Sequence, residues 1–151
     1  MRLHQHVVAS GTVSAGIFAV SRSLTVALVS FVSGFLIDLD HYIDFWRENP
    51  FDFNVRRFFA TCEGYELRKL VLVLHSWELL LLLAAFTYLT RSGIALGLLV
   101  GGTQHLLLDQ KANYTYPLSY SFIYRFLHGF RGEAVFDAGA FRRQEAERGN
   151  H

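Results

Sequence analysis

Apolar residues along the chain are concentrated in four runs that carry almost no charge. The runs cover residues 3–21, 23–37, 70–90 and 92–108, and the third contains five consecutive leucines. A helix that crosses a membrane needs about 20 mostly apolar residues. The third and fourth runs fall within the usual range of about 17–25 residues. The apolar middle of the first run, residues 7–20, and the second run are shorter and would thin the bilayer or extend through polar flanks. The pattern therefore predicts an all-α, small polytopic membrane protein with four transmembrane helices.

The composition agrees with this interpretation. Of the 151 residues, 52% are hydrophobic and 18% are charged, and the formal net charge is +1. These values exclude intrinsic disorder, and the near-neutral charge gives no reason to expect nucleic acid as a partner. Cys62 is the single cysteine, which excludes an internal disulfide and a thiolate metal cluster. Two alternatives stay open, a soluble bundle of very apolar helices and a cleaved signal peptide formed by the first run.

The positions of lysine and arginine predict the orientation. With four spans, twelve of the fourteen basic residues lie on the side of the termini, and Arg22 and Arg91 lie on the other side in two tight turns. Positive charge marks the cytoplasmic side, so both termini are expected in the cytoplasm. We expect the chain to be integral to the inner (cytoplasmic) membrane of the cell, with membrane lipids as partners.

The polar parts of the chain complete the predicted domain organisation. Residues 47–69 suggest a cytoplasmic loop with a short helix, and residues 111–132 are rich in tyrosine and phenylalanine, which is typical of an interfacial segment. We therefore expect a single membrane-embedded helical domain over residues 1–132 and a polar, flexible tail over residues 133–151.

Ionisable residues within or at the ends of membrane spans are costly and usually functional. Here they form four clusters, and the predicted topology brings all four to the cytoplasmic face. The clusters are His4 and His6; Asp38, Asp40, His41 and Asp44; His75 and Glu78; and His105 and Asp109.

The spacing within the clusters suits a metal site. Residues three or four apart share a helix face, as Asp38 and His41 do, and helical bundles build carboxylate and histidine sites in this way. The nitrogen and oxygen ligands favour a divalent metal, zinc first, with manganese or iron as alternatives and one or two ions. The alternative is that each cluster is a solvated helix end or a hydrogen-bonded pair. His128 and His151 stand outside these clusters.

At these positions the sequence resembles the membrane-bound, metal-dependent hydrolases, also called LexA-binding, inner-membrane-associated hydrolases. That family carries an early histidine, P-D-x-D-H, H-R-G-x-T-H-S and H-x-x-x-D, in this order. The matching residues are His6 (or His4), Asp38, Asp40, His41, His75, Ser76, His105 and Asp109. The resemblance covers roughly residues 4–109 and implies a small multi-helix membrane protein with hydrolase activity.

Two positions depart from the family pattern. Ile37 replaces the proline, which is no ligand, and Leu70 stands where the first histidine of the third motif belongs. Glu78 is the candidate for the missing ligand. The alternative is a divergent branch with weakened or lost activity.

The first functional hypothesis is a metal-dependent hydrolase at the cytoplasmic face, acting on a small-molecule or lipid substrate such as a phosphoester. A bound metal lowers the pKa of water and polarises the scissile group. The expected metal ligands are His6, Asp38, His41, His75, His105 and Asp109. The candidates for the general base are Asp40 and Glu78. Asp44 is expected to orient a histidine. Trp77, Tyr114 and Tyr116 are expected to line the entrance to the site. The cations Arg56, Arg57 and Arg68 are expected nearby, where they would hold an anionic headgroup.

The second hypothesis is a non-enzymatic membrane protein, either a metal-binding scaffold or an ion or proton conduit. A conduit needs polar groups through the full depth of the membrane, and the clusters lie at one face only. The one-sided distribution of the clusters therefore favours a site at the membrane surface over a conduit. The glycine pair Gly101–Gly102 is expected to permit close helix packing rather than phosphate binding.

Overall fold

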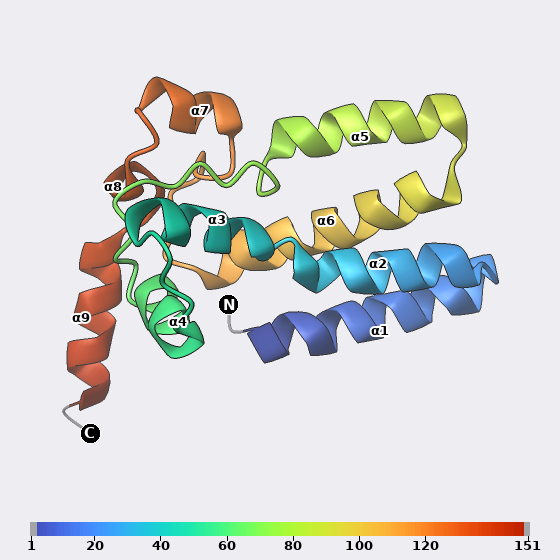
Figure 1. Cartoon of the computed structure of the whole chain (residues 1–151). Coiled ribbons are helices and arrows are strands. Elements are labelled where there is room, and N and C mark those ends of the chain that lie inside the picture. Colours follow the sequence, from blue (N-terminus) through green and yellow to red (C-terminus); the bar gives the residue numbers. More distant parts are fainter. Residues whose placement is uncertain (1–2, 150–151) are drawn as a thin grey trace.

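The computed structural model describes residues 3–149, and this part of the chain is helical apart from turns and two isolated β-bridges (Figure 1). The predicted all-α class is confirmed. The long helices of the bundle are α1 (Leu3–Ser21), α2 (Leu24–Leu36), α5 (Trp77–Thr90) and α6 (Gly93–Ala112). At one end of this bundle lie the elements of a cap, namely α3 (Leu39–Glu48), α4 (Val55–Glu63), α7 (Phe122–Leu127), α8 (Gly132–Val135) and α9 (Ala138–Gly149).

Helix α2 packs between α1 and α6, and α5 packs against α6. Glycines one turn apart on α6 allow its backbone to approach α2. A Cβ atom on Gly101 would lie 2.5 Å from the Ser30 carbonyl oxygen, and one on Gly97 would lie 2.9 Å from the Val26 carbonyl oxygen. Small residues at such spacing are typical of close helix packing in membranes. The prediction that the pair Gly101–Gly102 permits close packing is confirmed, since a Cβ atom on Gly102 would lie 2.9 Å from Leu80 Cδ2 on α5.

Two turns with the same Arg–Ser sequence close the bundle at the end opposite the cap (Figure 1). Arg22 and Arg91 adopt left-handed backbone angles, with φ of 52° and 54°. Ser23 and Ser92 then cap α2 and α6, because their hydroxyl oxygens accept a hydrogen bond from the backbone N–H three residues later. The two helical hairpins therefore have the same turn geometry. The other ends of the four helices, where α1 and α5 begin and α2 and α6 end, lie on the side of the cap.

The third apolar run is not helical throughout. Its helix, α5, begins at Trp77 rather than at residue 70, after a non-helical stretch that ends at Ser76, the N-cap. The reason is competition for backbone hydrogen bonds. In the stretch 71–75, several N–H groups donate to the carboxylates of Asp40 and Asp44 on α3 and so are not available for helical bonds.

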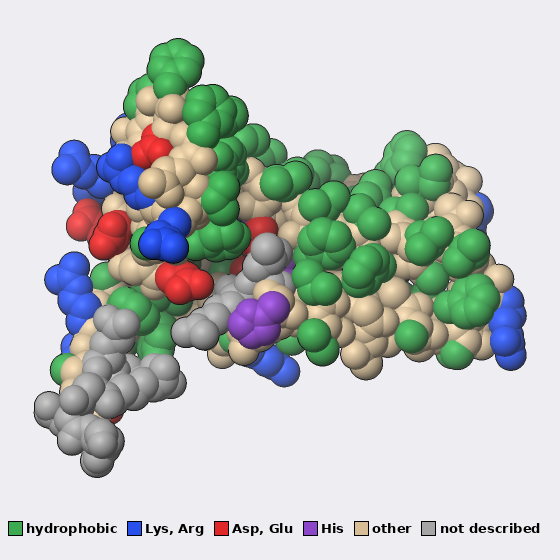
Figure 2. All heavy atoms as spheres, turned by 60° about the horizontal axis from the view of Figure 1, so that its bottom comes forward, with side chains coloured by type: hydrophobic (Ala, Val, Ile, Leu, Met, Phe, Trp, Pro, Cys, Tyr) green, Lys and Arg blue, Asp and Glu red, His purple; other side chains and the backbone are tan. Residues whose placement is uncertain are grey.

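One helical stretch, Leu24–Glu48, which joins α2 and α3, is long and apolar enough to cross a membrane, and Trp77–Thr90 is a shorter apolar helix. Length and composition alone do not distinguish such a stretch from a core helix or a signal sequence. The bundle also has large apolar side chains on its surface. Leu81, Leu82 and Leu89 on α5 are at least 70% exposed. Figure 2 shows apolar side chains over the bundle and charged ones gathered mainly at the cap.

The cap has an apolar core of its own, which extends beyond residue 132. Its buried members are Phe45, Leu67, Leu70, Leu72, Val135 and Phe136. The apolar core therefore continues past residue 132, where we expected the helical domain to end, because Val135 and Phe136 lie in the segment expected to be a tail. Helix α9 follows them in the stretch where we expected a flexible polar tail.

Candidate metal centre

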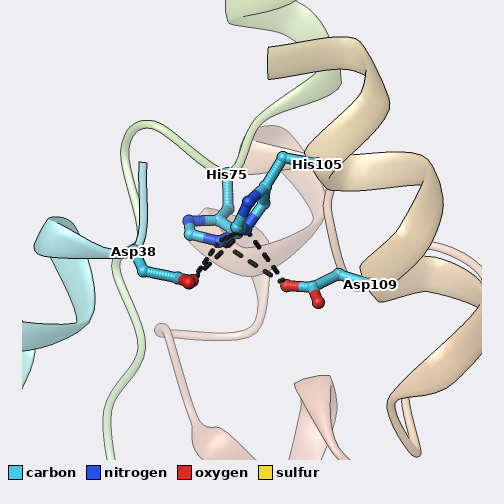
Figure 3. A group of neighbouring side chains, drawn as sticks. All are labelled: Asp38, His75, His105 and Asp109. Carbon is cyan, nitrogen blue, oxygen red and sulfur yellow. Dashed lines mark hydrogen bonds and ion pairs between the residues drawn. The ribbon is translucent and has the colours of Figure 1, made fainter. Parts of the chain in front are cut away.

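Four side chains from three parts of the chain meet where the bundle joins the cap (Figure 3). Asp38 lies in the turn between α2 and α3, and His75 lies just before α5. His105 and Asp109 are one turn apart near the end of α6. Each offers one ligand atom, and these four atoms all lie within 4.8 Å of one another.

The separations between these atoms match a tetrahedral ion. The Nε2 atoms of His75 and His105 are 3.0 Å apart. Their distances to Asp38 Oδ1 are 3.5 and 3.2 Å, and their distances to Asp109 Oδ2 are 3.7 and 3.4 Å. Zinc bonds of about 2.0 Å in a tetrahedron place the ligands about 3.3 Å apart. These five separations lie near that value, and the four atoms together could hold one zinc-sized ion.

Both histidines are held with Nε2 facing the centre. Nδ1 of His75 lies 2.9 Å from Asp40 Oδ1, and Nδ1 of His105 lies 2.9 Å from the carbonyl oxygen of Gly34. Each Nδ1–H can therefore donate to an oxygen, which leaves the Nε2 lone pair for a metal. Metal-binding histidines are almost always held by an oxygen acceptor in this way.

The centre is strongly negative and mostly dry. His75 and His105 are 0% exposed and Asp109 is 2% exposed, whereas the side chain of Asp38 is 30% exposed. Burial of His75 lowers its pKa, but the carboxylates of Asp40 and Asp38 outweigh this and raise the pKa to about 10. Buried carboxylates at such a density favour a cation among them, and Asp38 marks the open side.

His6 stands beside this group rather than in it. Its Nε2 lies 3.0 Å from Asp109 Oδ1, and its ring stacks on that of His105 with the centroids 4.0 Å apart. His6 therefore orients one ligand and supports another, and its buried Nδ1 has no hydrogen-bond partner among the described residues. Of the two candidates for the early histidine, His6 reaches the centre and His4 is exposed.

The acidic side chains of α3 form a row that holds the segment bearing His75. Asp40 accepts hydrogen bonds from the N–H groups of residues 74 and 75, Asp44 from those of residues 71 and 72, and Glu48 from that of residue 69. These three residues are four apart and therefore share one face of the helix. We call this set the α3 acid row. Asp44 was expected to orient a histidine, and its hydrogen bonds go to backbone amides instead.

The two carboxylates predicted as general bases are occupied elsewhere. Asp40 accepts from His75 Nδ1 and from two backbone amides. Glu78 accepts from the hydroxyls of Ser76 and Ser121 and from the N–H groups of Phe122 and Ile123. Asp40 therefore positions a ligand, and Glu78 anchors the start of α7. Leu70, where the resembled family has a histidine, lies in the apolar core of the cap.

His41 is the remaining predicted ligand, and it lies at the edge of the centre. Its Nδ1 is 3.3 Å from Asp40 Oδ1, its ring centroid is 4.7 Å from that of His75, and its side chain is 17% exposed. Asp40, His41 and His75 form a second group that could hold an ion. That group shares His75 with the first group and already contains the His75–Asp40 hydrogen bond. We therefore assign the metal centre to the first group.

A cavity of about 890 Å³ opens on the centre between the bundle and the cap. Asp38, His41 and Asp109 form its polar floor, and Tyr114 lines it as expected. Trp77 instead packs against a second apolar cluster around Leu106. Tyr116 borders a separate surface depression.

One buried cation near the centre, Arg125, was not predicted from the sequence. Arg125 is 0% exposed and donates to the carbonyl oxygens of Ser119 and Leu72. Burial lowers its pKa, and nearby carboxylates, Asp40 first, oppose that shift. An arginine within an aromatic segment is typical of a residue at the membrane interface. The sequence around Arg125 therefore did not indicate a buried hydrogen-bond donor.

Comparisons with protein-family models, curated proteins and solved structures find no match to this chain.

Proposed function

We propose that this protein is a metal-dependent hydrolase whose centre consists of Asp38, His75, His105 and Asp109. One observation carries the proposal: two buried histidines, each fixed through Nδ1, bring Nε2 close together, and two carboxylate oxygens lie within 4.8 Å of both. Zinc suits this set best, and manganese or iron are the other candidates. When bound, such an ion activates water and polarises the group to be cleaved.

The chain's own residues supply the remaining parts. His41 lines the cavity and lies beside Asp40 through Nδ1, which leaves its Nε2 for proton transfer. We assign the general base to His41, with Asp40 as its positioning partner. Asp38 is the most exposed ligand and borders the cavity, so substrate approaches from its side.

The family resemblance supports this proposal. The residues of its short motifs come from positions far apart in the sequence, and His6, Asp38, His75, His105 and Asp109 converge at one centre. We infer membership of the membrane-bound, metal-dependent hydrolases from this ordered set. Leu70 departs from the motif, but the set of four ligands is complete without it.

We also propose that α1, α2, α5 and α6 cross the membrane, with the centre at the cytoplasmic face. Exposed leucines and phenylalanines on the bundle support this, since such a surface is unusual for a soluble monomer. Single cysteines at Ser21 and at Ala112, in a Cys62→Ala background, should be labelled from opposite sides of the membrane. Labelling of both from one side would contradict the topology.

The test of the hydrolase proposal combines metal analysis and turnover. Protein purified without chelators should contain about one equivalent of metal, and cleavage of chromogenic esters and phosphodiesters should disappear with chelator and return with zinc. Metal without any turnover would favour the second candidate, a non-catalytic metal-binding membrane protein. The specific observation in its favour is that the chain offers four candidate ligands, which is the number found in structural zinc sites.

A further inference from the structure

The charges around the cavity at the metal centre do not suit a phosphate group. Its described lining includes the carboxylates of Asp38, Glu63 and Asp109 and no lysine or arginine. Two of these carboxylates would neutralise one divalent ion, so the floor would carry no net positive charge. Phosphate sites generally add Arg or Lys side chains to a metal.

The arginines expected to bind an anionic headgroup lie elsewhere. Arg56, Arg57 and Arg68 are exposed and are not among the residues that line the cavity. Arg57 is already paired with Asp52, at 2.6 Å. A substrate with a phosphate monoester would therefore lose hydration at the floor of the cavity without gaining a cationic partner there.

The walls of the cavity are apolar and continue to the surface. Leu36 and Leu39, at the α2–α3 junction, are 40% and 58% exposed, and Phe59 on α4 is 37% exposed. Phe35 and Phe141 also line the cavity. A chain of methylene groups can therefore enter along apolar side chains from the surface where the bundle meets the cap.

We propose that the substrate is an uncharged carboxylic ester with a long acyl chain, delivered from the lipid phase. This rests on the proposed hydrolase function and names its substrate class. The acyl chain lies along Leu36, Leu39 and Phe59, and the ester group reaches the floor. Water adds to the carbonyl carbon while its proton passes to His41. The C–O bond then breaks, and the alcohol leaves with that proton.

The first experiment compares p-nitrophenyl acyl esters of 4 to 12 carbons with bis-p-nitrophenyl phosphate, using the zinc-loaded full chain in lipid nanodiscs. We expect the esters to be cleaved faster and kcat/KM to rise two- to fourfold per added methylene until the cavity is filled, since each buried methylene strengthens binding by about that factor. Faster cleavage of the phosphodiester would overturn the inference and leave the hydrolase proposal intact.

A charge variant tests the electrostatic argument. Glu63→Lys places a cation on the cavity wall, so the ratio of phosphodiester to ester cleavage should rise severalfold. Glu66→Lys makes the same change three residues away at an exposed position outside the lining and should leave that ratio unchanged. An equal ratio of phosphodiester to ester cleavage in the unchanged protein and in both variants would contradict the charge argument.

Binding is measured separately from turnover, so that it decides the inference even if no substrate is cleaved. Matched diazirine probes of equal chain length, one an acyl methyl ester and one an alkyl phosphate, are photolysed in phosphatidylcholine vesicles containing the protein. The ester should label the peptides of residues 35–42 and 55–63 at least threefold more than the phosphate. Phe59→Ser should reduce this labelling, and Phe53→Ser, at an aromatic outside the lining, should not. Stronger labelling by the phosphate would overturn the inference.

Discussion

The Nε2 atoms of His75 and His105 lie 3.0 Å apart, although the two residues are 30 positions apart in sequence. Neither ring can rotate away freely, because Asp40 and the Gly34 carbonyl group hold their Nδ1 atoms. With both Nδ1 atoms facing oxygen acceptors, this short Nε2–Nε2 contact needs a shared positive charge, either a proton on His75 or a metal ion beside both rings. Asp38 and Asp109 balance that charge.

Removal of one ligand should release the metal. His105→Ala should reduce bound zinc from about one equivalent to less than a tenth, measured by elemental analysis after dialysis, because the variant loses one of the two nitrogen ligands of the centre. His128→Ala is the matched control, since His128 is exposed and lies near Tyr124, away from the centre. Full zinc content in His105→Ala would exclude His105 as a ligand.

Asp40→Asn should weaken metal binding without abolishing it. The amide cannot supply the negative charge that Asp40 places on His75 Nδ1, and loss of such a partner typically costs 10- to 100-fold in metal affinity. Competition with a zinc chelator measures the change. Asp52→Asn, which weakens only an exposed ion pair with Arg57, should leave the affinity unaltered.

His41→Gln separates catalysis from metal binding. If His41 transfers the proton, kcat should fall by about 10²- to 10⁴-fold while the zinc content stays near one equivalent. Added imidazole should restore part of the rate. A variant that loses its zinc would instead place His41 among the ligands, as the sequence suggested.

Glu78→Ala should loosen α7 rather than the metal centre. The carboxylate accepts from the N–H groups of Phe122 and Ile123 and from two hydroxyls, so its loss should cost about 1–2 kcal/mol of unfolding free energy. Faster hydrogen exchange at residues 122 and 123 would localise the effect. Glu133→Ala removes an exposed carboxylate in a loose pair with Arg131 and should change stability by less than about 0.5 kcal/mol.

Gly101→Ala should destabilise the bundle by about 1–3 kcal/mol, because its methyl group would meet the backbone of α2 around Ser30. Gly16→Ala is the internal control, since no atom lies within 4 Å of its Cβ position. That variant should be neutral or up to about 1 kcal/mol more stable. Thermal unfolding in detergent compares the two, and equal stability would contradict the close packing of α2 and α6.

The sequence predicted the helices of the bundle and the convergence of the ionisable clusters, because both follow from periodicity and topology. It could not show that residues 70–76 are not helical, since an apolar run has the same composition in either state. It also could not separate ligands from residues that position them. From the sequence, the carboxylates of Asp40 and Glu78 were expected to be available as bases. The fold shows that both already accept hydrogen bonds from backbone N–H groups.

The α3 acid row holds the segment before His75 through main-chain N–H groups, which every residue except proline possesses. The exposed side chains of Lys69, Val73 and Leu74 can therefore vary while His75 keeps its place, whereas Leu70 and Leu72 are also constrained by the core of the cap. Proline at residues 71, 72 or 74 is the substitution that this arrangement forbids, whereas α3 must keep acids at every fourth position. In divergent sequences, the spacing of acids on α3 is therefore a more durable signature of this centre than the segment that it holds.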